Sequence, residues 1–212
     1  MFKTALLIVD MQNDFVEGGS LPVVGGKSII PVINDIINIS KVRGYHILAS
    51  KDYHPEMHIS FEENKIFYEN KAFDSFLKKQ TEFWPPHCVI GSGGSEFCWE
   101  LNTRYINRIF YKGTILLSDA YSVFHNDISL DKNNYSFNGY LKHFNIQRLF
   151  VCGLTMDYCV LNTCKDAKKA GYDVYLITDA TKMVDESKRK EIEKVYQSIG
   201  VHLINFNIFK NI

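Results

Sequence analysis

Apolar residues occur along the chain in short, nearly uninterrupted runs. Each run is rich in Val, Ile, Leu and aromatic residues, and polar positions do not alternate with them as they would on a half-exposed strand. Strands that are apolar on both faces are typical of parallel sheets, which helices cover on both sides. We therefore expect strands at residues 5–9, 45–50, 108–113, 148–153, 173–178 and 201–206.

Helical patterns lie between these runs. Isoleucines recur at helical spacing over residues 29–37, and Gly44 follows as a stop signal. Further helices are expected at 138–144, 158–170 and 186–198, and a glycine follows closely after each of the last two. The repeated order of strand and helix predicts an α/β fold, a three-layer α/β/α sandwich around a mainly parallel sheet of about six strands.

The segment from residue 51 to residue 95 interrupts this alternation of strands and helices. It contains three prolines and the Gly93-Gly94 pair, and it is too long for a plain connection. Loops of this length in compact domains are usually functional. We interpret the segment as a loop or lid inserted into a single domain that spans residues 1–212.

The composition narrows the range of functions. Of the 212 residues, 46% are hydrophobic and 14% are aromatic, which is typical of a folded globular protein. Basic and acidic residues number 24 each, so the formal net charge of zero gives no general reason to expect binding to nucleic acid or to an acidic membrane. The apolar run before Asp10 is too short for a signal peptide, and no run is long enough to span a membrane.

The cysteines favour a reducing compartment. They are odd in number and contain no C-x-x-C pair, so we do not expect a disulfide framework. We expect a cytoplasmic location instead. The five are Cys88, Cys98, Cys152, Cys159 and Cys164.

Four chemically capable residues lie near the ends of expected elements. Asp10, Asp52 and Lys112 fall at or just beyond the carboxyl ends of three strands, where ligands bind in open α/β sheets. Cys159 lies near the start of a helix, where unpaired N–H groups and the helix dipole favour a thiolate. Each also has an ordinary interpretation: a buried structural cysteine, a turn-forming or helix-capping aspartate, or an edge-strand lysine that reaches solvent.

The region after Asp52 offers metal ligands. Asp52 and His54 are two residues apart, so both side chains lie on the same side of an extended chain, and His87 follows a rigid Trp-Pro-Pro turn. One carboxylate and two imidazoles suit Zn²⁺, Mn²⁺ or Fe²⁺ with open positions. His58 and Ser60 are candidates for supporting such a site. A surface position or a satisfied ring is the preferred interpretation for His58, His46, His125, His143 and His202.

The order of these motifs resembles that of nicotinamidases, a branch of the isochorismatase-like cysteine hydrolase superfamily. The Asp, Lys and Cys blocks are typical of the superfamily, and the blocks with the histidines are typical of the branch. The blocks run from about residue 5 to residue 181. They are LLIVDMQNDFVEGGSLPV, ASKDYHPEMHISF, FWPPHCVIGSGGSEF, YKGT, DAYSVFHND and VCGLTMDYCVLNTCKDAKKAGYDVYLITDA.

The resemblance implies a catalytic set. Asp10 is similar to the general base, Cys159 to the nucleophile that forms a thioester, and Lys112 to the third catalytic residue. Backbone N–H groups of Thr155 and Cys159 would form the oxyanion hole, and a cis peptide of the family matches the Leu154–Thr155 bond. The loop reads GLTMDYC, where the family more often has a small residue before threonine.

The resemblance also implies a cofactor, one divalent metal ion, with zinc expected and manganese or iron as alternatives. Asp52, His54 and His87 match its ligands, which makes residues 51–95 a metal-binding loop. In nicotinamidases this metal binds the pyridine nitrogen of the substrate and points the carboxamide at the cysteine.

A substrate pocket follows from the same resemblance. Phe15, Trp84 and Tyr158 match positions that line the aromatic ring pocket, although ordinary core packing is also open to them. Asp119 matches an acidic position near the active-site lysine.

The expected reaction is nicotinamide and water to nicotinate and ammonia, in NAD salvage, with pyrazinamide as a second substrate and a homo-oligomer as the assembly. An amidohydrolase acting on maleamate, carbamoyl compounds or biuret is the nearest alternative, but those branches generally lack the metal set. A binding protein that retains the fold would have lost one of the three catalytic residues. A thiol redox protein would need a resolving cysteine well placed beside Cys159.

Overall fold

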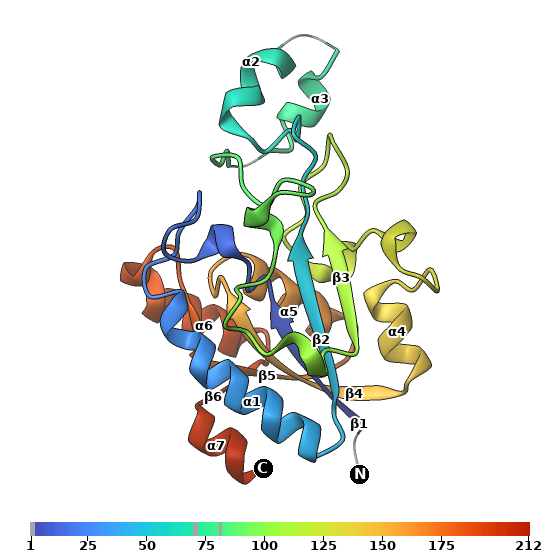
Figure 1. Ribbon diagram of the computed structural model, residues 1–212, viewed down its shortest axis with the longest axis vertical. Helices are drawn as coiled ribbons and strands as arrows, with labels where there is room; N and C mark the ends of the chain where they lie inside the picture. The colour runs from blue at the N-terminus through green and yellow to red at the C-terminus, as the bar shows by residue number, and fades with distance from the viewer. Residues whose placement is uncertain (1–2, 70–71, 81) are drawn as a thin grey trace.

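The expected strands are present in the computed structural model, which describes residues 3–69, 72–80 and 82–212. Within these residues the strands form one sheet, and every neighbouring pair is parallel. They are β1 (Lys3–Val9), β2 (His46–Asp52), β3 (Arg108–Lys112), β4 (Ile146–Leu154), β5 (Asp173–Lys182) and β6 (His202–Ile204). Their order is β3-β2-β1-β4-β5-β6 (Figure 1).

Helices follow the strands much as the sequence predicts. The α-helices are α1 (Ile30–Val42), α2 (Lys65–Tyr68), α3 (Asp74–Leu77), α4 (Phe137–His143), α5 (Cys159–Lys169), α6 (Arg189–Ser198) and α7 (Phe206–Asn211). Short 3-10 helices occur at Asn13–Phe15, Lys27–Ile29, Glu62–Asn64, Gly93–Ser95, Thr103–Tyr105, Val123–His125, Ile128–Leu130 and Glu186–Lys188.

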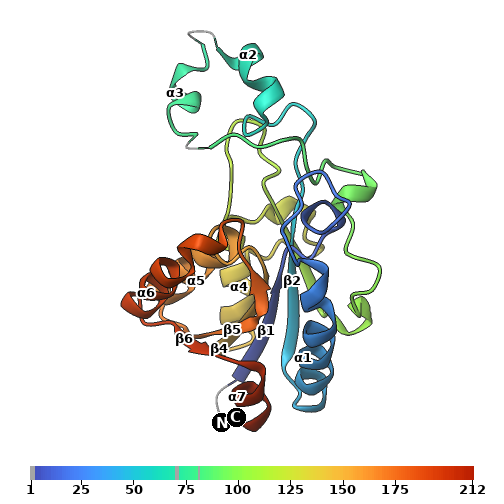
Figure 2. The same ribbon diagram turned by 90° about the vertical axis from the view of Figure 1, so that its left-hand side faces the viewer.

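The sheet is the middle layer of three, as expected for strands that are buried on both faces. Along β1, Leu7 and Val9 face one apolar core together with residues of α4, α5 and α6. Leu6 and Ile8 face a second core together with residues of α1 and α7. Figure 2 shows the two groups of helices on opposite sides of the strands. This alternation at a period of two residues explains why the runs read as continuously apolar.

The carboxyl ends of the strands face the inserted segment between β2 and β3. β1 lies in the middle of the sheet, with β2 on one side and β4 on the other, so the chain changes direction across the sheet at this point. The connection from β2 to β3 extends beyond the sheet and carries a lobe with α2 and α3 (Figures 1 and 2). An open crevice at such a strand-order reversal is where α/β proteins bind ligands.

The inserted segment begins slightly later than predicted. Lys51 and Asp52 are the last two residues of β2, because they pair with Tyr111 and Lys112 of β3. Asp52 is thereby held on a strand of the sheet and not on a flexible loop.

Two further expectations concern the whole chain. All five cysteines are free thiols and are buried. In the part of the chain that the structure describes, no helix has the length and apolar character needed to cross a membrane.

We predict that Gly153→Ala lowers the free energy of unfolding by at least about 2 kcal/mol, because Gly153 has φ +106° and an added Cβ would overlap the backbone of Val9. Gly44→Ala is the matched control, since Gly44 has φ +70° and open space around it. The loss of stability in this control measures the cost of placing an alanine at a positive φ, which is about 1 kcal/mol. Urea unfolding of the two variants checks this, and equal losses would contradict the close approach of β4 to β1.

Candidate active site

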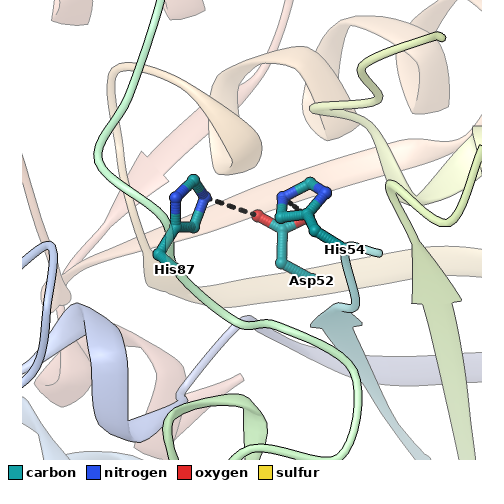
Figure 3. A group of neighbouring side chains, drawn as sticks. All are labelled: Asp52, His54 and His87. Atoms are coloured by element: carbon teal, nitrogen blue, oxygen red, sulfur yellow. Dashed lines mark ion pairs between the residues drawn. The ribbon is translucent and has the colours of Figure 1, made fainter. Parts of the chain in front are cut away.

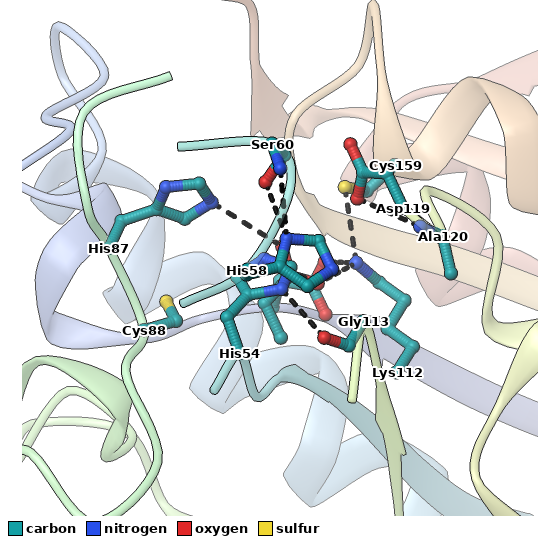
Figure 4. A network of polar contacts seen from close by, with 12 residues as sticks. His54, His58, Ser60, His87, Cys88, Lys112, Gly113, Asp119, Ala120 and Cys159 are labelled. Atoms are coloured by element: carbon teal, nitrogen blue, oxygen red, sulfur yellow. Dashed lines mark hydrogen bonds and ion pairs between the residues drawn. The ribbon is translucent and has the colours of Figure 1, made fainter. Parts of the chain in front are cut away.

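Four expected catalytic and metal residues meet at the carboxyl edge of the sheet. Asp10 directly follows β1, Asp52 ends β2 and Lys112 ends β3. Cys159 is the first residue of α5, which lies over the same edge. Figure 4 shows the sulfur of Cys159 and the ammonium of Lys112 pointing toward each other from different elements. Residues 149 positions apart in the chain are therefore brought into one cluster.

Lys112 is the centre of this cluster and is completely buried. Its Nζ lies 2.9 Å from Oδ2 of Asp10, 2.5 Å from Oδ1 of Asp52 and 3.4 Å from Sγ of Cys159. Burial by itself would lower the pKa of Lys112, but the two carboxylates raise it well above its ordinary value. The alternative of an edge-strand lysine that reaches solvent is wrong, because β3 is an edge strand but the side chain points into the site.

Asp10 has the environment of a proton acceptor. Its side chain is fully buried, and Ser50 donates a hydrogen bond of 2.7 Å to Oδ1. Burial raises the pKa of Asp10 and outweighs the opposing effects of Lys112 and Ser50. A carboxylate oxygen of Asp10 lies within 4.8 Å of Sγ of Cys159. The carboxylate caps no helix, which excludes the helix-capping interpretation.

The thiol of Cys159 is less acidic than its position on a helix suggests. Burial raises the pKa of Cys159 well above its usual value, and the opposing effect of the Lys112 ammonium does not offset this. The position at the helix N-terminus therefore does not by itself make this thiol acidic. A base is needed to remove the proton, and the neighbouring carboxylate of Asp10 can do this.

The loop before Cys159 offers two unused donors. Among the described residues, the backbone N–H groups of Thr155 and Cys159 donate no hydrogen bond. The Leu154–Thr155 peptide bond is cis, as the resemblance implied. Tyr196 donates a buried hydrogen bond of 2.6 Å to the carbonyl of Met156, which holds this loop against α6. The arrangement suits the binding of a developing oxyanion.

Asp52, His54 and His87 converge beside the cluster (Figure 3). Nε2 of His54 lies 3.7 Å from Oδ1 of Asp52, and Nε2 of His87 lies 4.0 Å from Oδ2. Nδ1 of His54 donates to the carbonyl of Gly113, and Nδ1 of His87 donates to that of Pro85, both at 2.8 Å. These bonds leave both Nε2 lone pairs facing the carboxylate, which is the donor set that a divalent cation requires.

Burial and charge act differently on these three residues. Burial alone would raise the pKa of Asp52, but Lys112 and His54 lower it far below its ordinary value. Burial lowers the pKa of His87 to about 4, so this ring is neutral and able to bind a metal at neutral pH. For His54, burial lowers the pKa, but the Asp52 carboxylate raises it more.

His58 supports the site and is not a free ligand. Its Nδ1 lies 2.7 Å from Oγ of Ser60, and its Nε2 lies 3.3 Å from the carbonyl oxygen of Ser118. Its ring packs against His54 with a centroid distance of 4.3 Å. This agrees with a satisfied buried histidine, the interpretation preferred from the sequence. His58 also forms a second carboxylate–histidine group with His54 and Asp119.

A pocket opens onto both clusters. The three residues expected to line it do so: Phe15, Trp84 and Tyr158. Nε1 of Trp84 donates to Oη of Tyr121 at 3.1 Å, and the rings of Trp84 and Tyr158 lie edge to face at 5.1 Å. Asp119 also lines the pocket, with its Oδ1 accepting from the N–H of Ala120 at 2.8 Å.

Sequence reasoning missed several apolar and aromatic residues of the pocket. Tyr121 lies in the DAYSVF block and Leu21 and Val23 lie in the SLPV block, so motif membership was a signal for all three. No local signal points to Val184, which follows β5 and reaches the pocket only through the fold. The missed residues are Leu21, Val23, Tyr121, Leu154 and Val184.

The fold and this cluster define a class of protein, a parallel α/β sandwich with a buried aspartate, lysine and cysteine beside a histidine–carboxylate group. The chain belongs to the isochorismatase domain family, whose family model matches residues 4–205.

Relatives and solved structures agree with this assignment. The chain is 39% identical over 183 residues to a nicotinamidase of Escherichia coli, covering 85% of this chain and 84% of the relative. It superposes with a TM-score of 0.78 and 33% identity on the pyrazinamidase of Pyrococcus horikoshii in complex with zinc, covering 96% and 99% of the two chains. PnC1 from L. infantum in complex with nicotinate gives a TM-score of 0.80 and 34% identity, with coverage of 96% and 93%.

We predict that His54→Ala or His87→Ala lowers zinc affinity by at least about a hundredfold, because each removes a ligand from a set of three. Metal analysis after dialysis against a weak chelator measures the effect. His143→Ala on the exposed end of α4 is the control and should retain zinc. Equal zinc content in all three variants would rule out this site.

Proposed function

We propose that this protein hydrolyses nicotinamide to nicotinate and ammonia. The observation that carries the proposal is the meeting of two groups at one aromatic pocket, which Cys159 of the first group and all three residues of the second line. The first group is Asp10, Lys112 and Cys159, and the second is Asp52, His54 and His87. The first group suits nucleophilic attack on a carboxamide, and the second suits a metal that orients a ring nitrogen. The nicotinamidase and pyrazinamidase relatives support this choice of substrate.

In the first half-reaction, Asp10 removes the proton from Sγ of Cys159, and the sulfur attacks the carboxamide carbon. The carbonyl oxygen becomes negative and accepts hydrogen bonds from the N–H groups of Thr155 and Cys159. Asp10 then gives its proton to the amine, the C–N bond breaks, and ammonia leaves a thioester on Cys159. The Lys112 ammonium stabilises the negative charge that passes between Asp10 and the sulfur.

In the second half-reaction, water replaces ammonia. Asp10 takes a proton from the water as its oxygen attacks the thioester carbon, and the same N–H groups stabilise the oxyanion. The C–S bond breaks, nicotinate is released, and Asp10 returns the proton to Sγ. Because one carboxylate acts in both steps, its raised pKa suits a group that must alternate between base and acid.

A divalent metal would be held by Asp52, His54 and His87, whose donors fit one by tautomer and charge. A bound metal would supply a Lewis acid for a ring nitrogen, so that these three residues would orient the carboxamide toward Cys159. We propose zinc as this ion, which the zinc complex of the P. horikoshii pyrazinamidase supports. Phe15, Trp84 and Tyr158 would pack against the ring.

Several finer points belong to the same proposal. Pyrazinamide is a second substrate, because its ring nitrogen has the same relation to the carboxamide. Five buried free thiols favour a reducing, cytoplasmic setting in which the product enters NAD salvage. A homo-oligomer, as the resemblance to nicotinamidases implied, is the proposed assembly. Residues 1–212 act as one domain, because both clusters draw on residues from most of its length.

We predict that Cys159→Ala reduces ammonia release from nicotinamide by at least about a thousandfold, because among the described residues that line the pocket Cys159 is the one that carries a thiol. Cys164→Ala is the control, since Cys164 is a buried thiol on the same helix. It should keep the rate within about threefold. Substantial ammonia release by the Cys159 variant would exclude Cys159 as the nucleophile, and loss of activity in the Cys164 variant would favour a two-thiol mechanism.

We predict that Ser50→Ala moves the acid limb of kcat/KM to higher pH by about one unit. The hydrogen bond from Ser50 lowers the pKa of Asp10, so its loss raises that pKa, and the carboxylate form needed as base is reached only at higher pH. A hydrogen bond to a charged group contributes about 1.5 kcal/mol, and this free energy corresponds to a pKa shift of about one unit. A pH profile with nicotinamide measures it, with Ser40→Ala on α1 as a buried control. An acid limb that stays in place or moves down would contradict the role of Asp10.

A further inference from the structure

The side chain of Gln12 is bound to the backbone of Asp52. Its Oε1 accepts from the N–H of Asp52 at 2.8 Å, and its Nε2 donates to the carbonyl of the same residue at 2.8 Å. The second hydrogen on Nε2 goes to the carbonyl of Ser95 at 2.9 Å. The amide is completely buried, and both of its N–H groups are used. β1 has ended at Val9, so this amide supplies the pairing that the strand no longer gives to the end of β2.

The side chain of Asp14 binds the backbone next to His87, and this stretch of backbone binds the segment that carries His54. Its Oδ2 accepts from the N–H of Cys88, the residue after His87, at 2.7 Å. The carbonyl of Cys88 in turn accepts from the N–H of His54 at 3.0 Å. Cys88 has φ +48°, a conformation that a non-glycine residue keeps only when its surroundings impose it. Figure 4 shows Cys88 and His87 on one stretch of chain beside His54.

We propose that Gln12 and Asp14 are positioning residues that hold the metal ligands in place. Gln12 contacts the backbone of Asp52, which is itself a ligand. Asp14 contacts the backbone of Cys88, which joins the segments that carry the two histidine ligands. The same segment begins with Asp10, so it also sets the placement of the base relative to the metal. This inference rests on the metal site proposed above.

Geometry supports a positioning role over general packing. Two of the three hydrogen bonds of Gln12 end on the ligand residue Asp52, and the hydrogen bond between Asp14 and Cys88 ends on the direct neighbour of His87. A Cβ on Gly94 would overlap the carboxylate of Asp14, so the neighbouring loop closes over this group. Asn13, between the two, donates instead to the carbonyl of Gly93, which lies away from the ligands. Three consecutive polar residues thus bind the same loop, but only two of them act on ligand segments.

The test compares zinc affinity among variants of the full chain, by competition with a zinc-binding dye, alongside urea unfolding of the metal-free proteins. Asp14→Asn keeps the shape but leaves one oxygen for two N–H groups, those of Cys88 and Ser20, which Oδ2 and Oδ1 of Asp14 now accept. Gln12→Met removes all three hydrogen bonds at similar volume. Both should weaken zinc binding by about 10–100-fold, the range for groups that orient metal ligands. Asn13→Ala is the matched control and should bind zinc within about threefold of the natural protein.

The outcomes separate this inference from the proposed function. His87→Ala serves as the reference: if it binds zinc normally, the proposed metal site itself fails. If His87→Ala loses zinc while Asp14→Asn and Gln12→Met bind it as tightly as the natural protein, only the positioning role is overturned. A lower free energy of unfolding with unchanged zinc affinity also overturns it. Should Gln12→Met not fold, Asp14→Asn decides, with Asp14→Glu, which retains the carboxylate, expected to restore part of the affinity.

Discussion

The site depends on one buried cation. Lys112 carries its charge in a fully buried position between Asp10 and Asp52, with the sulfur of Cys159 as a further neighbour. An isolated ammonium there would cost several kcal/mol in lost hydration, and only opposite charges at hydrogen-bond distance offset this. The two carboxylates face the same penalty. Each charged group is therefore stable only while the others are present, which makes the cluster a single electrostatic unit.

This unit joins two kinds of chemistry. Asp52 binds Lys112 through Oδ1 and faces His87 through Oδ2, so one carboxylate belongs to both the catalytic and the metal group. In Asp10, Oδ1 accepts a hydrogen bond from Ser50 and Oδ2 lies 2.9 Å from Nζ of Lys112. A ring held at the metal group would thereby lie at a defined position relative to the nucleophile. Such fixed placement lowers the entropic part of the barrier to attack on a neutral amide.

The parallel sheet is what makes the arrangement possible. β1, β2 and β3 are neighbours whose carboxyl ends lie at the same edge, so the residues that end them come together without any strand leaving its register. The hydrogen bonds of Gln12 and Asp14 extend this order past the last residue of β1. The long connection between β2 and β3 then has room to bring His87 back to the edge and to project the α2–α3 lobe beyond it.

The amino-acid sequence by itself determined the architecture and the chemical groups. Uninterrupted apolar runs predict the strands, and helical spacing with glycine stops predicts the helices, because both signals arise from local geometry. Asp10, Lys112 and Cys159 were candidates because strand ends and helix starts are readable locally, and the resemblance to nicotinamidases implied their roles. Only the tertiary structure decided that Lys112 is buried, that burial raises the pKa of Cys159, and that Val184 reaches the pocket. Those properties depend on distances between residues far apart in the chain and on the exclusion of water, which no local pattern encodes.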